Sequence, residues 1–245
     1  MESLLLPSKI RYATGERPHE GVLTVEPCSP GYGTTIGNAL RRVLLSSLPG
    51  AAVTAVKIKG VDHEFSTIDH VKEDVVEVIL NLKSLRMKLF SEEPVKIFLK
   101  ASGEKVVTAA EFEANSAVEI VNPEHTICTL TDKKASVEME VTIGPGRGYR
   151  TTEERAKEKL ELGNIAIDAL YSPVLNVSYK VEATRVGEKT DYDKLVLRVE
   201  TDGTIDAKEA IMESVKILTD HFSLLTQPDM AETASDSEAA NEETL

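Results

Sequence analysis

The sequence contains no tryptophan and only two cysteines, Cys28 and Cys128, within its 245 residues. The cysteines lie far apart and no Cys-x-x-Cys pair occurs, which excludes a zinc ribbon or a dithiol redox motif and predicts two free thiols. No run approaches the ~18 consecutive apolar residues of a membrane span. The N-terminus lacks the basic start and apolar core of a signal peptide. We therefore expect a cytoplasmic protein without membrane contact.

Basic residues are also in the minority, with 28 Lys and Arg against 41 Asp and Glu and a net charge of -13. A strongly acidic chain repels the phosphate backbone, so binding of nucleic acid over a broad face is excluded. Any contact with DNA must be local or be made by a partner.

The phosphate-binding motifs are incomplete. Gly31 and Gly33 begin a dinucleotide fingerprint, but the third glycine would fall on Ile36. No Gly-Lys-Ser/Thr is present for a P-loop. We expect turn glycines that lead into a helix, and no bound cofactor.

The metal-binding and catalytic patterns are incomplete as well. His63 begins a zinc-protease pattern, but Thr67 stands where the second histidine is required, and His70 is out of register. Asp191 and Asp193 form an Asp-x-Asp pair with no third carboxylate placed to help, which is typical of turn or strand-entry residues. We expect no catalytic residue and no metal site. A metal-dependent enzyme built on these residues is the alternative.

Strict alternation of apolar and polar residues recurs along the chain. Alternation with a wet face predicts antiparallel strands. The segments that show it are 56–59, 95–100, 137–143 and 195–199.

Helical spacing of apolar residues predicts three helices. The first has Thr34 or Thr35 as its cap and ends at Pro49-Gly50, and Asp206 with Glu209 forms a capping box before the third. The apolar faces are Ile36, Ala39, Leu40, Val43, Leu44 and Leu48; Val71, Val75, Val78, Ile79 and Leu82; and Ala207, Ala210, Ile211, Ser214, Leu218, His221 and Leu225.

Helices mixed with antiparallel strands give an α+β fold class. The charged segment 152–164 is expected to be a solvated helix or loop. Segment 144–149, GPGRGY, is interpreted as a hairpin connection or as an anchor on a partner. Segment 227–245 has six acidic and no basic residues and is expected to be a disordered acidic tail.

The first helix carries two adjacent cations, Arg41 and Arg42, beside its apolar stripe. One of them can fork towards a carboxylate. The stripes of the first and third helices can pack on each other or on their copies across a two-fold axis. Periodicity does not distinguish these arrangements.

The run 31-GYGTTIGNALRRVLLSSLPG-50 resembles the characteristic helix of the bacterial RNA polymerase alpha subunit. Further segments resemble the same family in the same order, over roughly residues 5 to 225. They are 60-GVDHEFSTIDHVKEDVVEVILNLK-83, 117-AVEIVNPEHTICTL-130, 146-GRGY-149, 171-YSPV-174 and 190-TDYDKLVLRVETDGTIDAKEAI-211.

The resemblance implies a discontinuous dimerisation domain of antiparallel strands and two amphipathic helices, built from residues 1–50 and 173–226. A mainly β second domain, 51–172, is inserted between these parts. It implies a homodimer that scaffolds assembly of the beta and beta-prime subunits, with omega and sigma in the assembly, for template-directed RNA synthesis. The dimer interface implied by the resemblance comprises Ile36, Leu40, Val43, Leu44, Ile211, Leu218, Phe222 and Leu225.

The resemblance also implies contacts with the large subunits. Arg42 matches the position that grips beta, and Leu45 and Lys83 match positions near the large-subunit contacts. Arg41, beside Arg42, and Arg147, in the basic segment 144–149 that can anchor on a partner, are also expected to bind beta or beta-prime. This subunit itself is expected to be non-catalytic.

The chain departs from the family at its end. A linker and a small C-terminal domain that binds upstream DNA and activators are expected to be absent, so DNA contact is indirect, through the complex. A free-standing dimeric adaptor that never joins a polymerase is a further alternative.

Overall fold

The computed structural model describes residues 4–155 and 163–226 of the chain. Both ends of the chain contribute to one four-stranded antiparallel sheet of order β1-β2-β14-β13. Helices α1 and α3 pack against this sheet and against each other. The elements are β1 (Lys9–Thr14), β2 (Glu20–Cys28), α1 (Tyr32–Ser46), β13 (Val174–Val186), β14 (Lys189–Thr201) and α3 (Ala207–Leu224).

The middle of the chain forms a second four-stranded sheet of order β11-β3-β9-β5, together with two-stranded ribbons and the helix α2. Its main elements are β3 (Pro49–Ile58), α2 (Val75–Lys83), β5 (Val95–Ser102), β9 (Ser136–Arg147) and β11 (Ile165–Ala166). The ribbons pair β4 (Met87–Leu89) with β7 (Val118–Ile120), β6 (Lys105–Thr108) with β8 (Thr126–Leu130), and β10 (Tyr149–Arg150) with β12 (Ala169–Leu170). A single 3₁₀ turn, η1 (Ala109–Glu111), follows β6.

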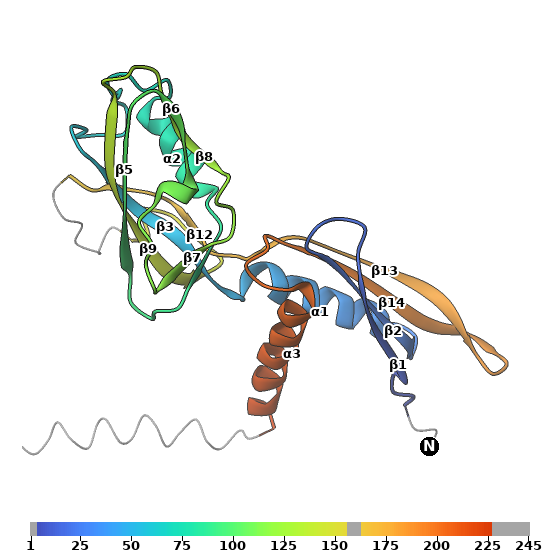
Figure 1. The fold of residues 1–245 in the computed structure, drawn as a ribbon. Helices are drawn as coiled ribbons and strands as arrows, with labels where there is room; N and C mark the ends of the chain where they lie inside the picture. Colours follow the sequence, from blue (N-terminus) through green and yellow to red (C-terminus); the bar gives the residue numbers. More distant parts are fainter. Residues whose placement is uncertain (1–3, 156–162, 227–245) are drawn as a thin grey trace, which may run out of the picture.

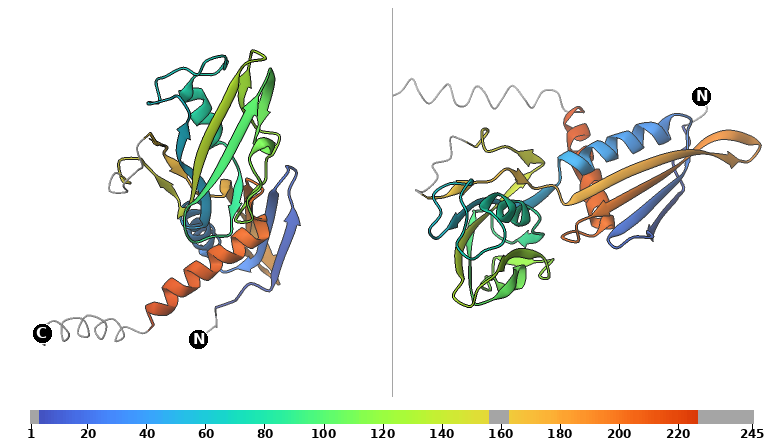
Figure 2. Two further views of the ribbon diagram at one scale, coloured as in Figure 1. Left: turned by 60° about the vertical axis from the view of Figure 1, so that its left-hand side comes forward. Right: turned by 90° about the horizontal axis from the view of Figure 1, so that it is seen from above.

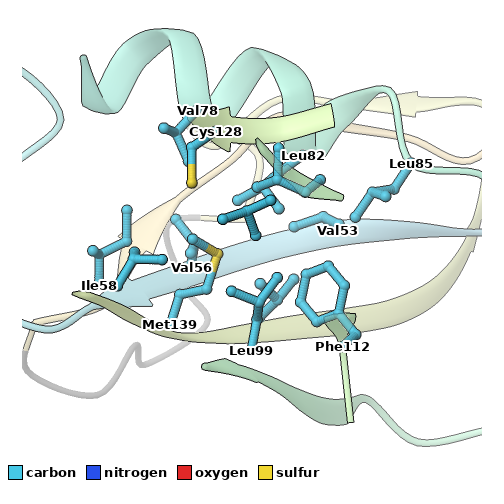
Figure 3. Close-up of a cluster of buried hydrophobic side chains, with 14 of the residues drawn as sticks. Val53, Val56, Ile58, Val78, Leu82, Leu85, Leu99, Phe112, Cys128 and Met139 are labelled. Atoms are coloured by element: carbon cyan, nitrogen blue, oxygen red, sulfur yellow. The ribbon is translucent and has the colours of Figure 1, made fainter. Parts of the chain in front are cut away.

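Each sheet has its own hydrophobic core, and the two lobes are separate in Figure 1. In the second core, α2 and β8 cover one face of the β3–β9–β5 sheet (Figure 3). The side chains meeting there include Val53, Val56, Val78, Leu82, Leu99, Cys128 and Met139. The α+β class and the antiparallel strands predicted from alternation are confirmed.

Helix α1 lies along the β13–β14 hairpin, as the view from above in Figure 2 shows. Glycines permit this close packing. A Cβ atom on Gly37 would lie 2.7 Å from Cδ2 of Tyr179 and 3.0 Å from Cδ1 of Leu195, and one on Gly33 would meet Val181 at 3.1 Å. Gly33 and Gly37 therefore serve helix packing.

The predicted cap of α1 is wrong. The helix begins at Tyr32, and its N-cap is Gly31, which has φ 84° and no side chain to cap with. The missing acceptor comes from another strand. Oδ2 of Asp193 in β14 accepts hydrogen bonds from the N–H groups of Gly31 (2.9 Å) and Gly33 (3.1 Å). A carboxylate is favourable there because it faces the positive end of the helix dipole.

The other two helices carry their own caps. Asp206 accepts from the N–H of Lys208, so the predicted start of α3 is confirmed. Asp74 accepts from the N–H of Glu77 at the start of α2. Val71 was predicted in this helix but lies before it, in a bridge with Leu130.

Segment 144–149 is not a hairpin connection. Its first residues continue β9, where Gly144 pairs with Ala52 and Arg147 pairs with Pro49. Of the charged segment 152–164, residues 156–162 lie outside the described part of the chain, as does the predicted tail 227–245.

We predict that Gly37→Ala destabilises the protein by about 1–3 kcal/mol, because the added methyl group overpacks the contact with Tyr179 and Leu195. Asn38→Ala, on the exposed side of the same helix, should change the free energy of unfolding by less than about 0.5 kcal/mol. Denaturant unfolding at fixed protein concentration measures both. Equal stability of Gly37→Ala and the parent chain would contradict this packing.

Candidate protein-interaction surfaces

The residues considered for metal chemistry do not come together. His63 contacts Ser66 in the second lobe, whereas Asp193 caps α1 in the first. Within residues 4–155 and 163–226, no group of three or more His, Cys, Asp or Glu side chains is arranged to hold a metal ion. In this part of the chain, none of the helices has the length and apolar character that a membrane span requires.

Three residues implied for the dimer interface, Leu40, Leu44 and Ile211, are buried in the chain's own core. At most 4% of each residue is exposed, so they have almost no surface left for a second copy. Ile36 and Val43 are half-buried on α1. Helices α1 and α3 thus pack on each other within one chain, an alternative that periodicity left open.

The apolar stripe of α3 continues beyond this core. Ile211 is buried and Leu218 is partly buried, but Phe222 and Leu225 are 61% and 77% exposed. At 3.6 residues per turn these positions lie on one face of the helix. Figure 1 shows the C-terminal half of α3 projecting away from both sheets. Within residues 4–155 and 163–226, nothing covers the end of the stripe.

Sequence reasoning missed two exposed apolar residues beside this stripe. Met212 and Val215 lie on the same helix and are exposed by 56% and 45%. Their spacing of three residues indicates a second apolar position on the helix surface, next to the face that carries Ile211. Together with Phe222 and Leu225 they form what we call the α3 apolar surface. A contiguous exposed apolar surface is typical of a site that binds another protein.

A second surface is cationic and begins on α1. Arg41, Arg42 and Leu45 are all exposed. In the described part of the chain, neither arginine makes an ion pair or a side-chain hydrogen bond. The described part of the chain offers no carboxylate to either arginine, so the expected pairing with a carboxylate stays a prediction. Both guanidinium groups are available to a partner.

The structure brings Arg147 to the same region. Pairing of β3 with β9 sets Arg147 opposite Pro49, directly after α1. A Cβ atom on Gly148 would lie 3.2 Å from the carbonyl oxygen of Ser46, the last residue of α1. Arg150 is exposed nearby in β10 and was missed from the sequence, because a two-residue strand gives no alternation signal.

Lys83 lies beside this region and forms an ion pair with Asp168. Its Nζ atom lies 3.8 Å from Oδ2 of Asp168, which also accepts a hydrogen bond from the hydroxyl of Tyr149 at 3.1 Å. The backbone N–H of Thr152 donates to Oδ1 of Asp168 at 2.9 Å. We call Arg41, Arg42, Leu45, Lys83, Arg147 and Arg150 the cationic surface.

The Asp168 network shifts two pKa values. The backbone hydrogen bond from Thr152, with the Tyr149 hydroxyl and the Lys83 charge, holds the pKa of the Asp168 carboxyl below its usual value. The hydrogen bond that the Tyr149 hydroxyl donates to Asp168 raises the pKa of Tyr149. Ionisation would remove the donated proton and place a phenolate beside the carboxylate.

An exposed apolar helix end, together with arginines that have no ion-pair partner in the described part of the chain, is typical of a protein of the subunit class. Comparison with known proteins agrees. A model of the "RNA polymerase Rpb3/RpoA insert domain" matches residues 56–172.

Relatives named DNA-directed RNA polymerase subunit alpha match over most of the chain. The protein from Roseiflexus castenholzii is 48% identical over 220 residues, which cover 90% of this chain and 68% of the relative. Those from Roseiflexus sp. (strain RS-1) and Alkaliphilus oremlandii are 51% and 52% identical, over 82% and 83% of this chain and 62% and 64% of the relatives. The chain belongs to the family of DNA-directed RNA polymerase alpha subunits and spans about two thirds of the length of these relatives.

We predict that the Tyr149 phenol titrates above the ordinary value of about 10, and that Asp168→Asn lowers its pKa towards that value. The amide carries no charge to oppose phenolate. NMR spectra of ¹³C-labelled tyrosine, recorded as a function of pH, measure this titration. Tyr12 is the internal control, because it lies on β1, far from Asp168. An unchanged Tyr149 titration in Asp168→Asn would contradict the network.

Proposed function

We propose that the chain forms a homodimer and scaffolds the assembly of the beta and beta-prime subunits of DNA-directed RNA polymerase. The observation that carries this proposal is the α3 apolar surface, whose stripe leaves the chain's own core and remains exposed. The reaction, template-directed nucleotidyl transfer, would belong to the assembled complex, with this subunit non-catalytic.

Burial energetics support the dimer. Covering each large apolar side chain such as Phe222 or Leu225 is worth about 1.5–3 kcal/mol. A two-fold axis presents the same surface twice, so two copies of α3 can cover one another. The half-buried Leu218 and the neighbouring Met212 and Val215 extend the area available.

The cationic surface supports a contact with a larger partner. Arginine forms bidentate hydrogen bonds with carboxylates and is favoured in protein interfaces. Arg41 and Arg42 project from a helix that is packed rigidly on β13 and β14 by its glycines. We propose that this surface binds beta or beta-prime, with Arg42 gripping beta.

We also propose the division into a dimerisation domain, residues 1–50 and 173–226, and an inserted domain, residues 51–172. Separate hydrophobic cores support this division, and so does the extent of the insert-domain match.

Charge on the α3 apolar surface should separate the dimer. We predict that Phe222→Glu combined with Leu225→Glu gives a folded monomer, because a buried carboxylate without a partner strongly disfavours association. Light scattering gives the mass, and circular dichroism gives the helix content. Ser223→Glu, in the same last turn but off the stripe, should leave the dimer intact. A dimeric double variant would remove this surface from the interface.

Loss of the cation on α1 should weaken capture of the large subunit. We predict that Arg42→Ala binds beta at least tenfold more weakly, which corresponds to about 1.4 kcal/mol, while the homodimer persists. Arg11→Ala, an exposed arginine on β1, is the matched control and should bind beta normally. Undiminished capture of beta by Arg42→Ala would show that this residue does not grip beta. Reconstitution with beta, beta-prime and template DNA separates a polymerase subunit from a free-standing adaptor.

A further inference from the structure

Three short segments that are far apart in the sequence meet between the two lobes. Gly50, at the start of β3, pairs with Gly146, near the end of β9. Tyr171 lies over both, and its N–H donates to the carbonyl of Gly148 at 2.8 Å. The Tyr171 side chain is buried and packs with Ala52 and Ala169, in a small cluster distinct from both larger cores.

At Gly146 and Gly50 there is no space for a side chain. A Cβ atom on Gly146 would lie 2.6 Å from Cε2 and Cζ of Tyr171, so the ring lies flat against the strand backbone. A Cβ atom on Gly50 would lie 1.8 Å from the carbonyl oxygen of Tyr171. No other residue type fits at either position without moving Tyr171.

The chain passes between the lobes twice, once from α1 into β3 and once from β12 into β13 (Figure 1). The Tyr171 cluster touches both passages, since Gly50 lies on the first and Tyr171 on the second. The two lobes also touch at a second contact, away from the Tyr171 cluster. There, Nη1 of Arg86 is 3.9 Å from Oδ2 of Asp202, and Val121 lies beside Gly203.

The cationic surface spans this junction. Arg41 and Arg42 belong to the lobe of α1, whereas Lys83 belongs to α2 in the other lobe. Rotation of one lobe on the other would change the distance between these cations. A partner that binds both then gains affinity when their separation is fixed beforehand, because less freedom is lost on binding.

We propose that Tyr171 is a positioning residue: its ring, packed on Gly146, and its carbonyl oxygen, held against Gly50, fix the angle between the lobes so that Arg42 and Lys83 reach the large subunit together. This inference rests on the proposed function, because it assumes that the cationic surface binds beta or beta-prime. Tyr171 itself is buried.

Spin labels on the two lobes can test the angle directly. Val106→Cys on β6 and Ser178→Cys on β13 are exposed sites on different lobes. The native thiols do not compete for the label, because Cys28 and Cys128 are buried and burial raises the pKa of Cys128 to about 12. Labelled chain is diluted into a large excess of unlabelled chain, so that pulsed dipolar spectroscopy reads distances within one chain.

We expect a narrow distance distribution in the parent chain, at least a twofold broader one in Tyr171→Ala, and at least tenfold weaker capture of beta by that variant. Tyr171→Phe retains the ring that packs on Gly146, so its distribution should be narrower and its capture stronger than those of Tyr171→Ala. Leu99→Ala, an equally buried truncation in the second core, should lower stability but leave the distances unchanged. If Tyr171→Ala fails to fold, Gly146→Ala, which displaces the ring by its methyl group, takes its place.

A narrow distribution in Tyr171→Ala, or a broad one with normal capture, would overturn the positioning role. The same measurements on Arg42→Ala distinguish this failure from failure of the proposed function. That variant should keep the narrow distribution and lose capture. Normal capture by Arg42→Ala would count against the function proposed for the cationic surface, whatever Tyr171→Ala does.

Discussion

The apolar stripe of α3 is the constraint on which the rest of the structure depends. Its first half holds α3 on the sheet, where Ile211 is buried with Leu40 and Leu44 of α1. Its second half, with Phe222 and Leu225, is exposed in the described part of the chain. In the proposed homodimer, the same helix face would serve both the stability of the single chain and its association with a second copy.

The elements packed around α1 hold its two arginines at the surface. Glycines allow α1 to lie close on β13 and β14, and the carboxylate of Asp193 in β14 caps its first turn. The rigid helix leaves Arg41 and Arg42 exposed and unpaired in the described part of the chain. The cationic surface extends over both lobes, with Arg41 and Arg42 on α1 and Lys83 on α2. Subunits that gather several partners depend on such fixed geometry more than on any single contact.

Much of the fold was predictable from local patterns. Alternation identified β3, β5, β9 and β14, and the Asp206 cap identified the start of α3. Long-range contacts were not predictable. The Asp193 cap on α1 joins residues about 160 positions apart, and no periodicity indicates it. The Gly144–Arg147 stretch reads as a loop, and only its partner strand makes it continue β9.

The candidate surfaces were predictable only in part. Helical spacing placed Ile211, Leu218 and Leu225 on one face but did not reveal where the chain's own core ends along α3. That limit depends on the position of the sheet under the helix. The resemblance to a known family supplied Arg42 and Lys83, while Arg150 and Tyr171 emerge only when distant strands are seen to meet.

Sedimentation equilibrium of the purified chain tests the central claim most directly. The uncovered end of α3 predicts a species of twice the chain mass at micromolar concentration, which dissociates only on strong dilution. A single-chain mass that persists throughout the micromolar range would contradict the account, because the exposed stripe would then be stable in water without a second copy.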